Sequence, residues 1–361
     1  MNEPKISIVT PMYNCEEYIV DCINSVLYQN FKDIEHIIID DCSTDKSAEI
    51  ASNIIEQHRG GEINFKLLRH EKNTGQGEAI NDGIAVARGK YIRVLHADDV
   101  FMPNALENLY NIAEQTGADV VHEPAKLISM SDNGATIKPG CQLRVDVHDH
   151  HPVNNVLMMS TDLNDRVADW FERGTHVDIM YNLFRRDFLI DNDIRFDECG
   201  GNFLFTFYWL MTAKTVVKVP QATYIYRAGN PTSVTNINQS FDYVERVIDS
   251  IVECNRCLDK FMSRIEFFSD KKWLRELIKI EAASINDSHS LRRRGFYHHG
   301  MTPELYEVVE RAMKKHFGED GWIAAFFFHV AHEIPRGRLL ENERLFRDQT
   351  KARYIIYRTA D

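Results

Sequence analysis

The segment Gly89–Asp99 carries the residues of this chain whose types and spacing point most directly to chemistry. Its apolar run Tyr91–Leu95 predicts a buried strand, and Asp98 and Asp99 follow at the carboxyl end of that strand. In an open α/β sheet, ligands bind at the carboxyl ends of the strands. Two adjacent carboxylates there can hold a hard divalent cation, and such a cation can hold a diphosphate. The alternative is that the two acids only cap the helix that follows Pro103.

Three further loops are predicted to leave strand ends at the same edge. They are Pro11–Asn14, Asp40–Asp45 and Asn73–Gly77. The first loop can bring the backbone of Pro11 and the ring of Tyr13 against the flat ring system of a nucleobase. Asp41 can accept a hydrogen bond from a ring N–H or a ribose hydroxyl. Gly75 lets the backbone approach a ligand closely. Together with Asp98 and Asp99, the loops predict one crevice for a nucleotide and a diphosphate.

Alternating strands and helices must position these loops. Apolar runs predict strands at 6–10, 34–39, 65–68, 91–95 and 118–122. Helical spacing predicts helices between them, one capped by Ser43 or Thr44 and another running from Pro103 to about Thr116. Strands separated by helices of this length predict right-handed βαβ units. The fold class is therefore α/β, a doubly wound, mostly parallel sheet with helices on both faces.

The alternation weakens after about residue 123. A strand is predicted at 177–184, an aromatic helix at 203–213 and a closing strand at Tyr224–Arg227. The period is helical from about residue 235 onward. We therefore expect one domain over 1–236, with halves 1–123 and 124–236, and a C-terminal helical region over 237–361.

Each of three other clusters of polar side chains allows two interpretations. His148–His151 could bind a metal or form a solvated loop. Cys254 and Cys257 form a CxxC without a second pair, so packing competes with a zinc or redox role. Arg292–Arg294 could touch a phosphate or an anionic membrane, or form a surface turn.

Composition narrows the class of protein. The formal net charge of −12 argues against a general nucleic-acid binder. The most apolar window, 322–331, is about half the length needed to span a bilayer. No signal peptide is visible, and seven scattered cysteines suit a reducing compartment. We expect a cytoplasmic protein, with the inner face of the membrane as a further site of action.

Motifs from Ile6 to about Leu109 closely resemble family 2 glycosyltransferases, the inverting enzymes with the GT-A fold. The matching pieces are SIVTPMYN at 7–14, SVLYQ at 25–29, IIDDCSTD at 38–45, NTG at 73–75, NDGI at 81–84, ARGKYI at 87–92, and Asp98-Asp99 with Pro103. A weaker resemblance continues through NLFRR at 182–186 and YIYR at 224–227. The first strand is not followed by G-x-G-x-x-G, which argues against a dehydrogenase.

The resemblance implies a nucleotide-diphosphate sugar donor, with a uridine diphosphate sugar favoured, and Mn²⁺ or Mg²⁺. It assigns base and ribose contacts to Thr10, Tyr13 and Asp41, the ribose-side acid to Asp98 and the metal ligand to Asp99. Residues 1–123 would then bind the nucleotide, and residues 124–236 the acceptor. The implied acceptor is a glycan, a lipid-linked molecule or a protein, as in polysaccharide biosynthesis.

Three positions depart from the family pattern. His96 stands where the family often has an acid, and it could be a metal ligand, a phosphate donor or a packed side chain. Ile80 replaces an arginine that would contact the donor. Asn202 stands where the family usually supplies its general base, and an amide cannot take a proton near neutral pH.

The missing base leaves two functions open. In an active transferase another acid would serve, with Asp197 and Glu198 nearest in sequence and Asp178 third. In the alternative, the chain is a catalytically degenerate module that binds a donor or a partner. The C-terminal helices could form a homo-oligomer, dock on a membrane or pack among themselves.

Overall fold

The computed structural model describes residues 3–123, 127–130, 155–172, 178–197, 201–228 and 241–287, and 307–316 without 309 and 313. The chain divides into two compact units, Met1–Asn236 and Ile237–Asp361. The His148–His151 cluster, Arg292–Arg294 and Glu198 lie outside the described residues.

An eight-stranded sheet forms the centre of the first unit, in the order β3-β2-β1-β4-β9-β6-β10-β8. Its strands are β1 (Ile6–Met12), β2 (Ile34–Asp40), β3 (Asn64–Arg69), β4 (Tyr91–Val94), β6 (Val120–His122), β8 (Leu157–Met158), β9 (Asn182–Arg185) and β10 (Val216–Lys218). Strands β3, β2, β1 and β4 pair in parallel, as do β6 and β10. Within this sheet, β9 is antiparallel to β4 and β6, and β8 is antiparallel to β10. The predicted mostly parallel α/β sheet is confirmed.

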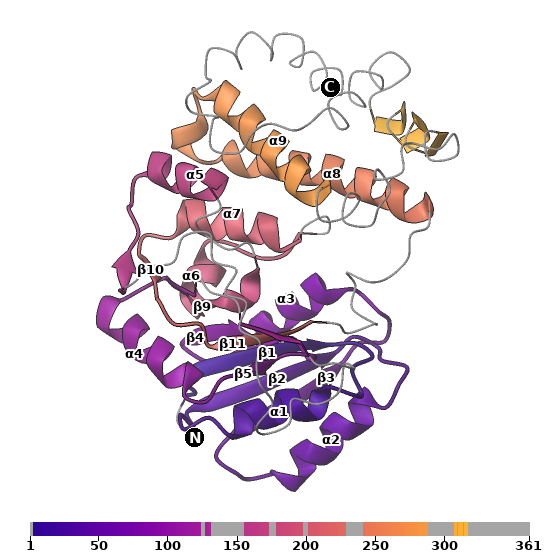
Figure 1. Cartoon of the computed structure of the whole chain (residues 1–361), viewed down its shortest axis with the longest axis vertical. Helices are drawn as coiled ribbons and strands as arrows, with labels where there is room; N and C mark the ends of the chain where they lie inside the picture. Colours follow the sequence, from indigo (N-terminus) through magenta and orange to yellow (C-terminus); the bar gives the residue numbers. More distant parts are fainter. Residues whose placement is uncertain are drawn as a thin grey trace. The chain divides into compact units, whose positions relative to one another are not determined.

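Helices cover both faces of this sheet (Figure 1). They are α1 (Ile19–Leu27), α2 (Ser47–Gln57), α3 (Gln76–Val86), α4 (Ala105–Thr116), α5 (Leu163–Glu172), α6 (Arg186–Asp191) and α7 (Asn202–Thr212). On one face, Ile8 of β1 shares a buried apolar cluster with Ile23 of α1 and Leu109 of α4. Helix α3 lies on the other face, where a Cβ on Gly83 would stand 2.3 Å from Cγ1 of Val9. Glycine therefore permits the close approach of α3 to β1.

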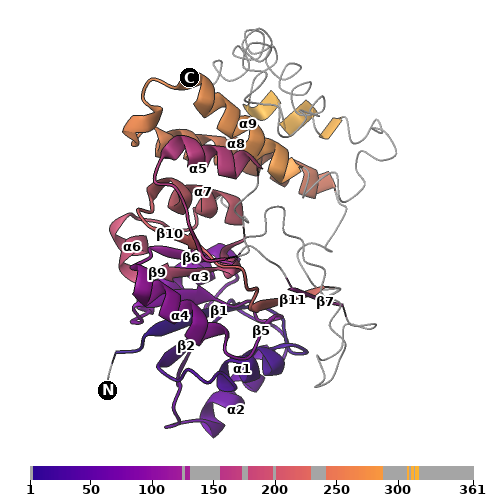
Figure 2. The same ribbon diagram turned by 60° about the vertical axis from the view of Figure 1, so that its left-hand side comes forward.

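A small second sheet lies beside the carboxyl end of β4. It joins β5 (Val100–Phe101), β11 (Tyr224–Ala228) and β7 (Leu127–Met130), with β11 in the middle (Figure 2). Strand β11 is the closing strand that the sequence predicts. Its pairing brings Tyr224 opposite Phe101, so a segment far along the chain reaches the loop after β4.

Three local predictions were wrong. Residues 177–184 do not form one strand, because Ile179–Tyr181 is a 3₁₀ helix (η1) and β9 begins at Asn182. Helix α2 begins at Ser47, and its first N–H donates to Asp45 at 2.9 Å rather than to Ser43 or Thr44. Helix α4 begins at Ala105, because Asn104 before it has a left-handed backbone.

The second unit is helical where it is described. Its elements are α8 (Phe241–Met262), η3 (Glu266–Phe268) and α9 (Lys272–Asp287). Leu258, Phe268 and Ile278 are fully buried, and Arg275 of α9 forms an ion pair with Asp259 of α8 at 2.7 Å. Cys254 is buried, and neither cysteine of the CxxC forms a disulfide. Among the helices described in either unit, none is long and apolar enough to cross a membrane.

Candidate functional site

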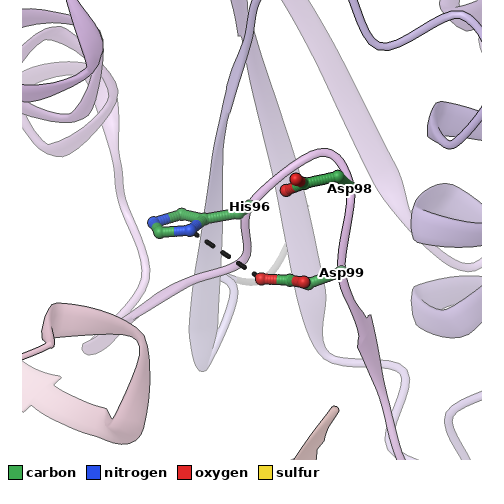
Figure 3. A group of neighbouring side chains, drawn as sticks. All are labelled: His96, Asp98 and Asp99. Carbon is green, nitrogen blue, oxygen red and sulfur yellow. Dashed lines mark ion pairs between the residues drawn. The ribbon is translucent and has the colours of Figure 1, made fainter. Parts of the chain in front are cut away.

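The loop that follows β4 gathers three metal-ligand side chains. His96, Asp98 and Asp99 each offer a ligand atom, and these atoms all lie within 4.8 Å of one another. Nδ1 of His96 is 3.8 Å from Oδ2 of Asp99. Figure 3 shows the Asp98 and Asp99 side chains pointing into the space enclosed by the turn, whereas the His96 ring lies outside the turn and is joined to Asp99 by the dashed line. The structure thus brings together the two predicted acids and adds His96 to them.

Asp99 also joins this loop to β11. Its carboxylate is fully buried. Oδ2 accepts a hydrogen bond from the Tyr224 hydroxyl at 2.6 Å, and Oδ1 accepts one from the Arg227 N–H at 2.7 Å. Burial and the adjacent Asp99 carboxylate raise the pKa of Tyr224 well above its usual value, so the phenol remains a donor. Asp99 is therefore no cap for α4, and the capping alternative is wrong for this residue.

The Arg227 side chain also contacts the loop that follows β4 and joins it to α1. Its Nε donates to the Asp98 carbonyl oxygen at 3.0 Å, and its Nη2 donates to Asp21 of α1 at 3.0 Å. The guanidinium also stacks on Tyr18, 4.9 Å from the ring centroid. Contacts from α1 and β11 thus hold the acidic loop before any ligand arrives.

The geometry of this cluster fits a divalent cation. Imidazole nitrogen and carboxylate oxygen bind such ions at about 2.0–2.2 Å, which places two neighbouring ligand atoms about 2.8–3.6 Å apart in octahedral or tetrahedral geometry. The His96–Asp99 distance of 3.8 Å lies just above that range, so a small movement of the two side chains would bring them to an ion. A carboxylate oxygen has two lone pairs, so the hydrogen bonds to Asp99 are compatible with metal binding. An imidazole among carboxylates suits a transition metal such as Mn²⁺ better than Mg²⁺.

The first residue of α3 contacts the acidic loop. Nε2 of Gln76 lies 2.7 Å from Nε2 of His96. Gly75, just before the helix, has φ +93°, a backbone conformation that favours glycine. Among the described residues other than Gly75 itself and its chain neighbours, no atom lies within 4 Å of the place a Gly75 Cβ would occupy, so that part of the chain leaves the backbone open to approach.

Asp41, in the loop after β2, organises the same segment. Its carboxylate is almost fully buried and accepts hydrogen bonds from the N–H groups of Thr74 and Gly75, each at 2.8 Å, and from Nδ1 of His70 at 2.8 Å. Burial raises the pKa of Asp41, but these donors outweigh burial and lower the pKa below its usual value. Asp41 is thus an ionised acceptor at the edge where β1, β2 and β4 end.

His70 bridges two acids and gives this site a pH dependence. Nδ1 contacts Asp41 at 2.8 Å and Nε2 contacts Asp82 at 3.0 Å. Burial lowers the pKa of His70, but the two carboxylates prevail and raise it above its usual 6.5. Protonation therefore stabilises the folded state. That contribution is complete below the unfolded pKa and is lost as the pH rises through the folded pKa.

We expect the His70→Gln variant to lose this dependence. Between about pH 6 and about pH 9, urea unfolding should show wild-type stability falling more than that of the variant. Equal changes in both proteins, or a His70 imidazole that titrates at or below 6.5 by NMR, would contradict the bridge.

The three predicted residues at the end of β1 differ in exposure. The Thr10 side chain is fully buried, and its hydroxyl lies 2.8 Å from Nε2 of His36. Burial lowers the pKa of His36 to about 3, so that pair is neutral. Pro11 is buried within β1. Only Tyr13, with 46% of its surface exposed, presents a ring to solvent. Thr10 could therefore offer a ligand its backbone but not its hydroxyl.

Three of the predicted acceptor-side residues are described, and two of them, Asn202 and Asp178, contact each other. Nδ2 of Asn202, at the start of α7, donates to Oδ1 of Asp178 at 3.1 Å. The Tyr208 hydroxyl, within α7, donates to Oδ2 of Asp197 at 2.6 Å. Asp178, named third from the sequence, is thus the acid beside Asn202.

The sequence pattern did not single out Tyr224, Arg227, His70 or Gln76 as site residues. The contact from Tyr224 to Asp99 crosses 125 positions of the chain. No local spacing signals such a contact. For His70 the signal was present, as a titratable side chain next to a strand end.

Comparisons with known proteins agree with this geometry. Residues 7–137 match the family model described as Glycosyl transferase family 2. The glycosyltransferase GlyG of Streptococcus pneumoniae is 29% identical over 272 residues, covering 73% of this chain and 85% of GlyG. The glycosyltransferase EpsJ of Bacillus subtilis is 31% identical over 240 residues, covering 65% of this chain and 64% of EpsJ.

Among solved structures, residues 1–349 of S. aureus TarS in complex with UDP-GlcNAc superpose with a TM-score of 0.58. The identity is 20%, and the match covers 96% of this chain and 91% of that one. This likeness supports the GT-A type fold that the sequence predicts. With the fold and the family match in agreement, residues 7–137 of this chain are a glycosyltransferase family 2 domain.

Proposed function

We propose that this chain transfers a glycosyl unit from a nucleotide-diphosphate sugar to an acceptor hydroxyl, with inversion at the anomeric carbon. One observation carries the proposal. The Asp41 loop and the His96–Asp98–Asp99 cluster lie at the same strand-end edge of a glycosyltransferase family 2 domain. The similarity to TarS, solved with UDP-GlcNAc, favours a uridine diphosphate sugar. A glycan, a lipid-linked molecule or a protein would supply the hydroxyl.

Each side chain has a role in donor binding. The exposed Tyr13 ring would lie against the base, and the ionised Asp41 carboxylate would accept from a ring N–H. The backbone at Gly75 would approach the nucleotide. His96, Asp98 and Asp99 would hold Mn²⁺ or Mg²⁺, and Asp98 would also face the ribose. Such an ion, when bound, offsets the negative charge that grows on the departing diphosphate.

Asp98→Asn is the cleanest test of donor binding, because Asp99 also supports the fold. We expect UDP-sugars with Mn²⁺ to stabilise the wild-type protein by about 2.7 kcal/mol at a hundredfold excess over Kd. Asp98→Asn should lose the metal-dependent part of that shift. Asp193→Asn makes the same chemical change on a carboxylate that is 69% exposed, and it should respond like the wild type.

Two outcomes would count against this proposal. One is a wild-type protein that no nucleotide sugar stabilises, with or without Mn²⁺. The other is an Asp98→Asn variant that responds to Mn²⁺ and donor as the wild type does. A donor-binding protein without turnover is the second candidate function, and the amide of Asn202 is the observation that favours it.

A further inference from the structure

The transfer proposed above requires a group that accepts the proton of the attacking hydroxyl. Asn202 stands at the start of α7, where the family usually places that acid, and its side chain is an amide. A general base must lie within hydrogen-bond reach of the proton it abstracts. The question is therefore which carboxylate the fold brings to the neighbourhood of Asn202.

Strand direction places Asp178 at the edge of the sheet that carries the metal-ligand cluster. Strand β9 runs antiparallel to β4, with Leu183 opposite Arg93. The residues that precede β9 therefore lie where β4 ends and the His96–Asp99 loop begins. Asp178 comes immediately before the 3₁₀ helix that leads into β9.

Aromatic contacts connect Asp178 to the acidic loop. The rings of Tyr181 and Tyr224 meet edge to face with centroids 5.5 Å apart, and the Tyr224 hydroxyl donates to Asp99. Burial raises the pKa of Tyr181 well above its usual value, and the Asp178 and Asp99 carboxylates both add to that rise. Both acids are thus close enough to act on one phenol.

Hydrogen bonds hold Asp178 in this place. Nδ2 of Asn182 donates to the Asp178 carbonyl oxygen at 3.2 Å, which fixes the backbone. Nδ2 of Asn202 donates to the Asp178 carboxylate at 3.1 Å, which fixes the side chain. The carboxylate is half-buried. We infer that Asp178 is the general base of this transferase and that Asn202 is the residue that positions its carboxylate.

The proton and electron balance is that of a single displacement. The acceptor hydroxyl gives its proton to the Asp178 carboxylate while its oxygen forms a bond to the anomeric carbon. The bond between that carbon and the diphosphate oxygen breaks, and its electron pair leaves with the nucleoside diphosphate. Asp178 then releases the proton to solvent.

Asp197 is the competing acid. Its carboxylate accepts the Tyr208 hydroxyl, and its neighbour Phe196 is held by Asn81 of α3 through two hydrogen bonds of 2.9 Å. These contacts hold Asp197 against Tyr208, in the middle of α7, whereas Asp178 contacts the first residue of α7 and lies at the end of β4. Asp197→Asn is therefore the matched comparison for Asp178→Asn.

The test measures UDP release from UDP-GlcNAc and other UDP-sugars with Mn²⁺, with water and a panel of sugars as acceptors, using the full chain. We expect Asp178→Asn to lower kcat by about 10²–10⁴-fold while its donor-induced thermal shift stays at the wild-type value. Asn202→Ala should lower kcat less, because the base remains but is poorly oriented. The double variant Asp178→Asn with Asn202→Asp moves the carboxylate across the same hydrogen bond. It should recover about tenfold or more of the lost rate, which a purely structural role for Asp178 would not produce.

Full turnover by Asp178→Asn, or a loss confined to Asp197→Asn, would overturn this assignment and leave the proposed function intact. Donor binding by the wild type with no hydrolysis or transfer would overturn both the base and the transferase. No binding of any nucleotide sugar would instead refute the proposed function itself.

Discussion

Replacing Glu123 with alanine is expected to lower the free energy of unfolding by about 3–5 kcal/mol. Glu123 and Arg93 are both fully buried, and Nη2 of Arg93 donates to Oε1 of Glu123 at 2.6 Å. Among the residues that the structure describes, Nε and Nη1 of Arg93 have no hydrogen-bond partner. Glu123 also accepts from the N–H of Thr223 at 2.6 Å. Its loss would leave a buried guanidinium without its counter-charge, and a buried N–H without its acceptor.

Urea unfolding of three proteins tests this expectation. The double variant Arg93→Met with Glu123→Leu removes both charges, so we expect it to be markedly more stable than Glu123→Ala. The double variant would share the lost contacts to Thr223 but carry no buried charge. A Glu123→Ala variant within about 1 kcal/mol of the wild type, far below the loss for a broken buried pair, would show that Arg93 finds another partner.

Asp99→Ala is expected to damage both fold and function. The Tyr224 hydroxyl and the Arg227 N–H would each lose a buried acceptor, at about 1–3 kcal/mol apiece, so stability should fall by about 2–6 kcal/mol. The variant should also lose the Mn²⁺-dependent thermal shift with UDP-sugars, because one proposed ligand is gone. The loss of stability follows from the complete burial of this carboxylate and from its hydrogen bonds to Tyr224 and Arg227 of β11.

Tyr224→Phe separates the two roles of Asp99. It removes the hydroxyl that contacts Asp99 at 2.6 Å and the His96 N–H at 3.1 Å, but it leaves every proposed metal ligand in place. We expect a moderate loss of stability with the Mn²⁺ response retained. A stable Asp99→Ala protein would contradict the structural role, and an Asp99→Ala protein that still responds to Mn²⁺ would contradict the ligand role.

The first half of the sheet could be predicted because the sequence signals for its strands and helices are local. Each of β1, β2, β3 and β4 is a short apolar run, and a helix of regular spacing separates it from the next. Right-handed crossovers then leave one arrangement, in which the loops after these strands share an edge. Asp41 and the acidic pair could therefore be placed at that edge from the order of the residues alone.

The second half could not be predicted in the same way. The run Asn182–Arg185 predicts a strand but gives no signal for the direction of that strand in the sheet. In the structure it lies between β4 and β6 and runs antiparallel to both. That reversal is what carries Asp178 to the site. The sequence also shows residue types without their orientation, so Thr10 was predicted to contact the nucleotide although its hydroxyl faces His36 inside the fold.

Asp99 supports the fold and is also a proposed metal ligand, and these two roles affect which residues would change first in the evolution of such a protein. A lineage released from selection for turnover would still need an acid at this position, because Tyr224 and Arg227 depend on it for their hydrogen bonds. Asp98 and Asp178 contribute less to the stability of the fold, so these two acids could be substituted first. In descendants of this chain, an intact residue at position 99 would therefore be a poor marker of retained activity, and positions 98 and 178 would be better ones.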